Sequence, residues 1–182
     1  NGAGKTTLFN LITGFLIPTS GEIEFKSEAI GGRKSHKIVK RGISKTFQIP
    51  KPFHSLTCLE NIVVSMISKF DTLNARRNEM EQRAMEILEV VGLKEKAFMR
   101  PAALTQADLK ILEVAKALGT RPELLLLDEP FAGLSLHEIE QLAEIALRLH
   151  EEGLTIIIIE HKLKELMKIV KRVHVLNFGT TI

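Results

Sequence analysis

The sequence has one cysteine and neither tryptophan nor tyrosine, and the cysteine count excludes the most. Cys58 has no second cysteine with which to form an internal disulfide, so a small fold held together by disulfides is excluded. A reducing compartment fits this composition, although a secreted domain without disulfides would look the same. We therefore expect a cytoplasmic protein.

Long hydrophobic runs and a large net charge are also missing. The longest apolar stretches, LLLL at 124–127 and IIII at 156–159, are far shorter than the ~18 residues expected of a membrane-spanning helix. The 25 basic and 22 acidic residues give a formal charge of only +3. The basic residues between 33 and 45 are typical of a solvated face. We expect no membrane span and no nucleic-acid partner.

The sequence lacks an initiating methionine and begins inside what looks like a motif. We expect from this that the chain is a fragment of a longer protein, which leaves the presence of a targeting segment open. The 182 residues, of which 45% are apolar, are enough for one globular domain spanning 1–182.

Strand patterns alternate with helical patterns along the chain. Polar–apolar alternation predicts a strand at 21–25 that begins a small antiparallel piece, and continuous apolar runs predict buried strands at 124–127 and 154–159. A third strand of the sheet is expected at 173–178. Helices are predicted at 8–12, within 59–98 with Gly92 as a C-terminal cap, from 101 to 118, at 136–152 behind a capping box of Ser135 and Glu138, and after 161. This order predicts an α/β fold whose largely parallel sheet is covered on both faces.

The opening residues NGAGKTT carry the last part of the nucleotide-binding motif G-x-x-x-x-G-K-[ST]. The glycines of such a loop let backbone N–H groups close around phosphate oxygens at the positive end of the following helix. Lys5 would reach the β- and γ-phosphates, and Thr6 would bind Mg²⁺. The alternative reading of this heptapeptide alone is a glycine-rich helix cap with an ordinary surface lysine.

An acidic pair directly follows the apolar strand in LLLLDEP. Asp128 and Glu129 are therefore predicted at the carboxyl end of a buried strand, where open parallel sheets bind their ligands. Asp128 is suited to hold Mg²⁺ through water, and Glu129 is suited to orient or deprotonate an attacking water. An acidic pair standing alone would more simply begin a solvated loop, but here a phosphate loop accompanies it.

One histidine follows an apolar strand in the same way. His161 in IIIIEH is expected at the same edge of the sheet as the phosphates, where it could sense the γ-phosphate. A histidine there, taken singly, is also compatible with a structural role. We expect the other histidines to be structural: His36, His54, His137, His150 and His174.

With these motifs in order, the chain resembles the ATP-binding subunit of ABC transporters along essentially its whole length. The remaining elements of that pattern are Gln48 in KTFQ, the signature segment LTQAD at 104–108 and the loop AGLS at 132–135. The resemblance implies a P-loop NTPase fold of the ABC ATPase type, with a mostly parallel sheet core and an antiparallel β lobe. It also implies an inserted helical subdomain near 53–103.

The resemblance further implies an ATP hydrolase, with ATP and Mg²⁺ as cofactors and in-line attack of water on the γ-phosphate. Glu129, His161 and Gln48 would be catalytic, and Thr6, Gln48 and Asp128 would bind the metal. In a head-to-tail dimer, the phosphate loop of one chain and the signature segment of the other would hold the nucleotide. These nucleotide-binding residues are Asn1, Gly2, Ala3, Gly4, Lys5, Thr6, Thr7, Leu104, Thr105, Gln106, Ala107 and Asp108.

The partners implied are a second ABC ATPase subunit, identical or paralogous, and transmembrane permease subunits. These would place the chain on the inner face of the cell membrane as a peripheral protein. The segments TFQ, FAGL, IIEH and VLNFGTTI are similar, more narrowly, to those of branched-chain amino acid importers. We therefore expect the chain to power uptake of branched-chain or other hydrophobic amino acids.

The chain departs from the family pattern at two places. The signature segment keeps a hydroxyl at Thr105 but has Gln106 and Ala107 where glycines are usual, and Ser135 stands where the loop usually has aspartate. An ATP-binding regulatory subunit with little turnover is therefore an alternative, and a translation-associated ABC ATPase is another. A DNA-repair ABC protein would need a long coiled-coil insertion, for which 48–104 leaves no room. The N-K-x-D motif of GTPases does not occur.

Overall fold

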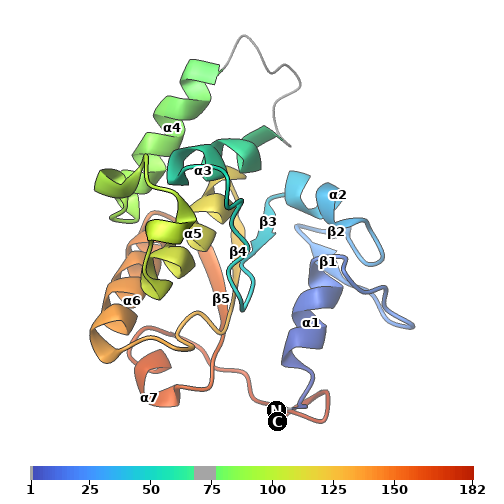
Figure 1. Ribbon diagram of the computed structural model, residues 1–182. Helices are drawn as coiled ribbons and strands as arrows, with labels where there is room; N and C mark the ends of the chain where they lie inside the picture. The colour runs from blue at the N-terminus through green and yellow to red at the C-terminus, as the bar shows by residue number, and fades with distance from the viewer. Residues whose placement is uncertain (1, 68–76) are drawn as a thin grey trace.

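A parallel sheet lies at the centre of the computed structural model, which describes residues 2–67 and 77–182 (Figure 1). Its strands are β3 (Ile43–Lys45), β4 (Leu124–Asp128) and β5 (Thr155–Ile159), in the order β3-β4-β5. The register pairs Ile43 with Leu124 and Asp128 with Ile159, so the three carboxyl ends meet at one edge. The predicted parallel α/β sheet is confirmed, and β3 is a strand that the sequence analysis did not predict.

Strand β4 is buried along its whole length, as its continuous apolar run predicts. Leu125 and Leu127 face one hydrophobic cluster, whereas Leu124 and Leu126 face a second cluster on the other side of the sheet. This division follows from the two-residue period of a strand. Strand β5 is different, because Ile157 on it is 43% exposed. The expectation that both faces are fully covered is therefore wrong for β5.

Helices α1 and α6 flank the sheet from opposite sides (Figure 1). Phe9 of α1 (Lys5–Ile12) lies in the cluster that contains Leu126 and Ile159, which fixes α1 against the sheet. Helix α6 (Leu136–Glu151) begins with the predicted capping box: Ser135 Oγ accepts from the Glu138 N–H at 3.4 Å, and Glu138 Oε2 accepts from the Ser135 N–H at 2.8 Å. Helix α2 (Ser35–Lys40) precedes β3.

The helices α3 (Cys58–Met66), α4 (Arg77–Val90) and α5 (Gln106–Gly119) pack on one another beside the sheet. Gly119 is required at the crossing of α3 and α5, because a Cβ there would collide with Ser65 Oγ and lie 3.2 Å from the Ile62 carbonyl oxygen. Gly92 follows α4 with a φ of 76°, in agreement with its predicted capping role. Short 3₁₀ turns at Lys94–Lys96 and Pro101–Ala103 lead to α5. The helical subdomain boundary at 53–103 stays a prediction.

Two antiparallel hairpins complete the described part of the chain. Strands β1 (Glu24–Phe25) and β2 (Glu28–Ala29) form the small antiparallel piece that the sequence predicts. The predicted third strand of the parallel sheet is wrong: β6 (Leu176–Asn177) instead pairs with β7 (Thr180–Thr181) in a separate sheet. The expected lysine-rich helix after His161 is only the short α7 (Leu163–Leu166). Among the residues described, no helix is long and apolar enough to cross a membrane.

Candidate functional site

The glycine-rich loop ends at the amino end of α1 in the conformation that such loops need. Gly4 is the N-cap residue and has a φ of 93°, a left-handed conformation that favours glycine, and Gly2 has a φ of 84°. No side chain caps the first N–H groups of α1, which leaves them for a ligand such as phosphate. The Ala3 carbonyl accepts a hydrogen bond from the Gly179 N–H at 3.0 Å, so the β6–β7 turn supports the loop. Asn1 lies outside the described residues.

Thr6 lies on the same side of α1 as Asn10, a residue that is linked to Asp128 through Lys45. It is four residues before Asn10, and side chains with this spacing share one helix face. Asn10 Oδ1 accepts a hydrogen bond from Lys45 Nζ at 3.1 Å, and Lys45 Nζ is 2.9 Å from Asp128 Oδ2. Thr6 and Thr7 are exposed and Lys5 is half-buried. The amino end of α1 and the carboxyl end of β5 both point toward the lower edge of Figure 1.

Lys45 is a site residue that the sequence analysis missed. Its side chain is 9% exposed and that of Asp128 is 5% exposed, so their ion pair is buried. The expectation of a solvated face at 33–45 is wrong at this position, because β3 places Lys45 beside β4 and under Phe9, whose ring centroid is 5.6 Å from Nζ. Asp128 was selected because ligands bind at the carboxyl ends of parallel strands. The same reasoning would have selected Lys45, once residues 43–45 were recognised as a strand.

The predicted catalytic residues Gln48, Glu129 and His161 come together at the carboxyl edge of the sheet. Glu129 accepts from both neighbours, from Gln48 Nε2 at 2.5 Å to Oε2 and from His161 Nε2 at 2.9 Å to Oε1. Each residue follows a different strand, β3, β4 or β5, so the parallel register produces the cluster. Glu129 has a φ of 49°, a left-handed conformation uncommon outside glycine, while its N–H still donates to the Ile159 carbonyl at 2.9 Å.

Two further buried residues hold this cluster in place. Lys110 Nζ donates to the Glu129 carbonyl at 3.1 Å and to the Gln48 carbonyl at 3.4 Å, joining α5 to the segments that follow β3 and β4. Burial lowers the pKa of Lys110, and the charges of Glu160 and Glu129 act in the opposite direction. Glu160 accepts from the N–H groups of Phe131 at 2.6 Å and His161 at 2.9 Å. It thereby ties the loop after Glu129 to His161.

The signature segment lies at the start of α5, and two of its five residues are exposed whereas two are buried. Thr105 is the N-cap residue: its hydroxyl accepts from the Asp108 N–H at 3.1 Å, and Asp108 Oδ2 accepts from the Thr105 N–H at 3.1 Å. Thr105 and Gln106 are exposed, whereas Ala107 and Asp108 are buried. Leu104 packs partly against the core. Of this segment, only Thr105 and Gln106 therefore present exposed side chains to a partner, and the nucleotide contacts of the segment stay predictions.

Asp108 is also an ion-pair partner. Lys96 Nζ lies 2.7 Å from Asp108 Oδ2. Burial alone would raise the pKa of Asp108, but the hydrogen bonds from Lys96 and Thr105 outweigh it, and the pKa lies below its ordinary value. Ser135, the other departure from the family pattern, caps α6. Aspartate is also a favoured N-cap residue, so serine can take over that role at the start of a helix.

The residues at this edge fit Mg²⁺ bound together with a nucleotide. The buried Asp128 carboxylate already binds a cationic group in the structure, because it forms an ion pair with the Lys45 ammonium. Within 2–67 and 77–182, no group of three or more histidine, cysteine or acidic residues could hold a metal, which suits Mg²⁺, because this ion commonly takes one or two carboxylates and completes its shell with phosphate oxygens, other protein oxygens and water. Gln48 engages Glu129 through its amide nitrogen, which leaves its amide oxygen for that purpose.

Comparison with known proteins agrees with this geometry. The sequence profile of the family described as "ABC transporter" matches residues 1–132. The chain belongs to the ABC transporter family. It is 36% identical over 192 residues to the high-affinity branched-chain amino acid transport ATP-binding protein LivG of Escherichia coli K12, covering 99% of this chain and 75% of LivG. It is 38% identical over 191 residues to BraF of Pseudomonas aeruginosa, covering 98% of this chain and 75% of BraF.

Solved structures of ABC transporter cassettes have the same fold. A nucleotide-free ATP-binding cassette matches with a TM-score of 0.90 and 30% identity, over 100% of this chain and 76% of the cassette. A dimeric cassette bound to ADP and Pi in a post-hydrolysis state matches with a TM-score of 0.84 and 25% identity, over 97% of this chain and 78% of that one. The predicted family, the P-loop fold of the ABC ATPase type and the ATP hydrolase class are confirmed.

Proposed function

We propose that this ABC transporter ATPase binds ATP with Mg²⁺ between the glycine-rich loop and the carboxyl edge of the sheet, and hydrolyses it there. The observation that carries the proposal is the cluster of Gln48, Glu129 and His161, in which the Glu129 carboxylate is held from both sides. It lies at the sheet edge where parallel α/β folds bind ligands.

The glycine-rich loop binds the phosphates in this account. Backbone N–H groups at the start of α1 donate to phosphate oxygens, and the helix dipole favours the negative charge. Lys5 contacts the β- and γ-phosphates. Thr6, Asp128 and Gln48 hold Mg²⁺, which when bound neutralises charge on the phosphate oxygens. Lys45 must then share Asp128 with the metal or withdraw toward Asn10, its other hydrogen-bond partner.

Glu129 orients and deprotonates the attacking water. A carboxylate held from both sides keeps one geometry, and Lys110 further fixes the Glu129 backbone. His161 contacts the γ-phosphate from the neighbouring strand while it orients Glu129. Gln48 contacts both Glu129 and the segment that leads to α3, so it couples the site to the region that meets a permease.

A second ATPase subunit completes the site. We propose that the exposed Thr105 and Gln106 at the start of α5 reach the nucleotide held by the partner chain, as in a head-to-tail dimer. The similar cassette solved as a dimer with ADP and Pi supports this assembly. The subunits then sit on transmembrane permeases at the inner face of the cell membrane. Branched-chain amino acids are the proposed cargo, because LivG and BraF are named for their transport.

The test uses the full-length protein reconstituted with its permease subunits in proteoliposomes. We expect ATP-dependent uptake of leucine, isoleucine or valine, and we expect Lys5→Ala to abolish uptake by weakening nucleotide binding. Lys37→Ala is the matched control, because Lys37 is an exposed lysine on α2. Uptake that continues unchanged with Lys5→Ala would contradict the phosphate-loop assignment, and uptake of other solutes alone would contradict the cargo.

A further inference from the structure

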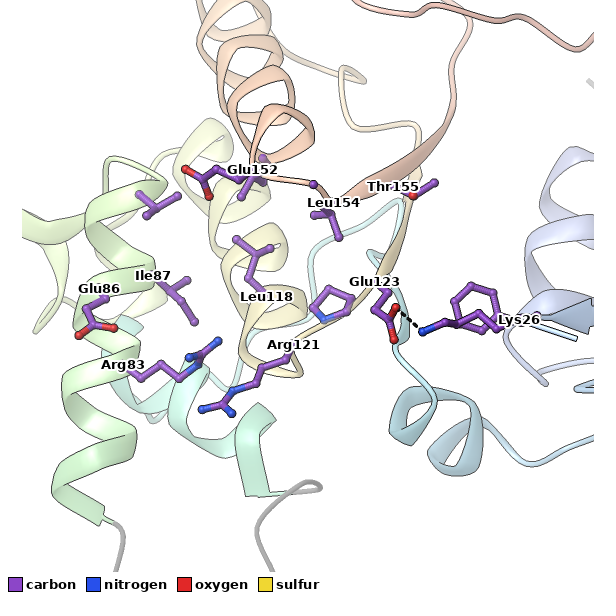
Figure 2. A pocket seen from close by; sticks show the side chains of 15 residues that line it. Lys26, Arg83, Glu86, Ile87, Leu118, Arg121, Glu123, Glu152, Leu154 and Thr155 are labelled. Carbon is purple, nitrogen blue, oxygen red and sulfur yellow. Dashed lines mark hydrogen bonds and ion pairs between the residues drawn. The ribbon is translucent and has the colours of Figure 1, made fainter. Parts of the chain in front are cut away.

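A cavity of about 670 Å³ opens at the amino ends of β4 and β5, the end of the sheet opposite the nucleotide site (Figure 2). Helix α4, the end of α5 and the turn after α6 form its walls. Ile87, Val90, Leu118 and Leu154 supply an apolar surface. Nothing in the proposed hydrolysis uses this cavity.

Two arginines approach each other at one end of the cavity. Figure 2 shows Arg83 reaching from α4 toward Arg121, which follows α5. Arg83 Nε is buried and has no hydrogen-bond partner, the one such side-chain nitrogen or oxygen in the part of the chain that the structure describes. Arg121 directly follows the C-cap residue of α5 and has a φ of 51°, and its N–H donates to the Leu118 carbonyl at 2.9 Å, as is usual where a helix ends in a left-handed residue.

An anion would give Arg83 Nε the hydrogen-bond partner that it lacks. Burial and then the charge of Arg121 lower the pKa of Arg83, so the charged guanidinium of Arg83 is disfavoured where it stands. The Nε edge of a guanidinium binds a carboxylate with two parallel hydrogen bonds, and Arg83 Nε has that edge available. The left-handed end of α5 places the Arg121 guanidinium at the same end of the cavity.

The other charges of the cavity select the kind of anion. Glu123 is paired with Lys26, whose Nζ lies 2.7 Å from its Oε2, and the remaining charges of the lining are Arg83 and Arg121 against Glu86 and Glu152. These four charges cancel, so a dianion would leave an excess of two negative charges and a monoanion an excess of only one, which makes the monoanion the less strongly repelled ligand. The apolar wall beside the arginines favours a ligand with a short hydrocarbon chain.

We propose that this cavity binds a small monocarboxylate with a short aliphatic chain. The carboxylate contacts Arg83 and Arg121, and the chain packs on Ile87, Val90, Leu118 and Leu154. This site is separate from ATP hydrolysis, because its residues lie at the amino ends of the strands. A failure of the proposed ATP hydrolysis would therefore leave this proposal unaffected.

The test is calorimetric titration of the full-length protein with isovalerate, alongside isoamyl alcohol and inorganic phosphate. Isovalerate is expected to bind with a dissociation constant on the order of 1 mM, typical of so small a ligand. Isoamyl alcohol has the same hydrocarbon chain without the charge, and we expect it to bind at least ~10-fold more weakly, as is usual when a charged hydrogen-bonding partner is lost. Phosphate is expected to bind more weakly than isovalerate, since it lacks the chain.

Single variants assign the binding to the arginines. Arg83→Gln and Arg121→Gln should each weaken isovalerate binding by about 10-fold, the usual effect of losing a charged hydrogen-bonding partner. Arg77→Gln is the matched control, because Arg77 lies on the same helix but pairs with Glu81 outside this cavity. The exposed Arg121 keeps the test decisive if Arg83→Gln fails to fold. Equal binding of isoamyl alcohol, tighter binding of phosphate, or no effect of Arg121→Gln would overturn the proposal.

Discussion

Lys45 Nζ lies 2.9 Å from Asp128 Oδ2, and both side chains are buried where β3 runs beside β4. The ammonium also contacts Asn10 and the ring of Phe9, so one side chain links α1 to two strands of the sheet. The residue proposed to bind Mg²⁺ is therefore neutralised within the protein by a lysine of the neighbouring strand β3, which also contacts the phosphate-loop helix.

Removing the lysine should leave an unpaired carboxylate in the interior. We expect Lys45→Met to lower the free energy of unfolding of the full-length protein by about 3–5 kcal/mol. The double variant Lys45→Met, Asp128→Asn should lose less than Lys45→Met alone, because no unpaired charge is left. Lys40→Met, at an exposed lysine of α2, is the control. Urea unfolding measures each value, and additive effects of the two substitutions would contradict the coupling.

Asp108 should make stability depend on acid pH. Its pKa is lowered in the folded protein by Lys96 and Thr105, so its stabilisation is complete above its ordinary pKa and is lost as the pH falls through the folded value. We expect Asp108→Asn to be less stable by about 1 kcal/mol at pH 7, a typical contribution of a helix cap. The difference from the wild type should begin to shrink below about pH 4, the ordinary range of an aspartate, and should disappear only below the lowered pKa of Asp108 in the folded protein.

Urea unfolding at several pH values checks this expectation. Glu144→Gln, an exposed carboxylate on α6, should follow the wild-type curve throughout. A difference between Asp108→Asn and the wild type that stays constant from pH 7 to pH 3 would show that the capping box does not depend on the charge of Asp108.

The signature segment allows the effects of its two non-glycine residues to be separated. Gln106 is exposed, and in the proposed dimer its side chain would approach the partner's nucleotide, whereas Ala107 packs in the core. We expect Gln106→Gly to raise the ATP turnover of the assembled dimer, because it removes a Cβ from the close approach. Ala107→Gly should instead lower stability by about 1 kcal/mol without raising turnover. Unchanged or lower turnover with Gln106→Gly would contradict the steric explanation.

The sequence alone was sufficient to locate the site residues that follow the end of a predicted strand. Asp128, Glu129 and His161 each lie within two residues of the end of an apolar run, and the carboxyl ends of parallel strands meet at one edge of a sheet. Lys45 was missed because β3 was not recognised as a strand, and Glu160 was passed over although it directly follows the apolar run at 156–159. Lys110 was missed because it lies within a helix and its contacts join segments far apart in the chain. No local pattern encodes such a pairing.

The end of the chain was misread for a different reason. Residues 173–178 alternate like a half-buried strand, but Val173 and Val175 are exposed and only Leu176–Asn177 are paired, in a hairpin. Alternation of polar and apolar residues shows which side chains share a face, but it does not specify the strand with which the segment pairs. The very short β3 was missed because three residues are too few to establish a period.

Glu129→Gln in the full-length protein, assembled with its partner subunits, tests the central claim most directly. The substitution keeps the size of the side chain and removes its ability to take a proton. We expect ATP binding to be retained and hydrolysis to fall by ~10²- to 10⁴-fold, the usual contribution of a general base. Glu140→Gln on the exposed face of α6 serves as the control. Wild-type hydrolysis by Glu129→Gln would contradict the assignment of Glu129 as the base, and with it the proposed site.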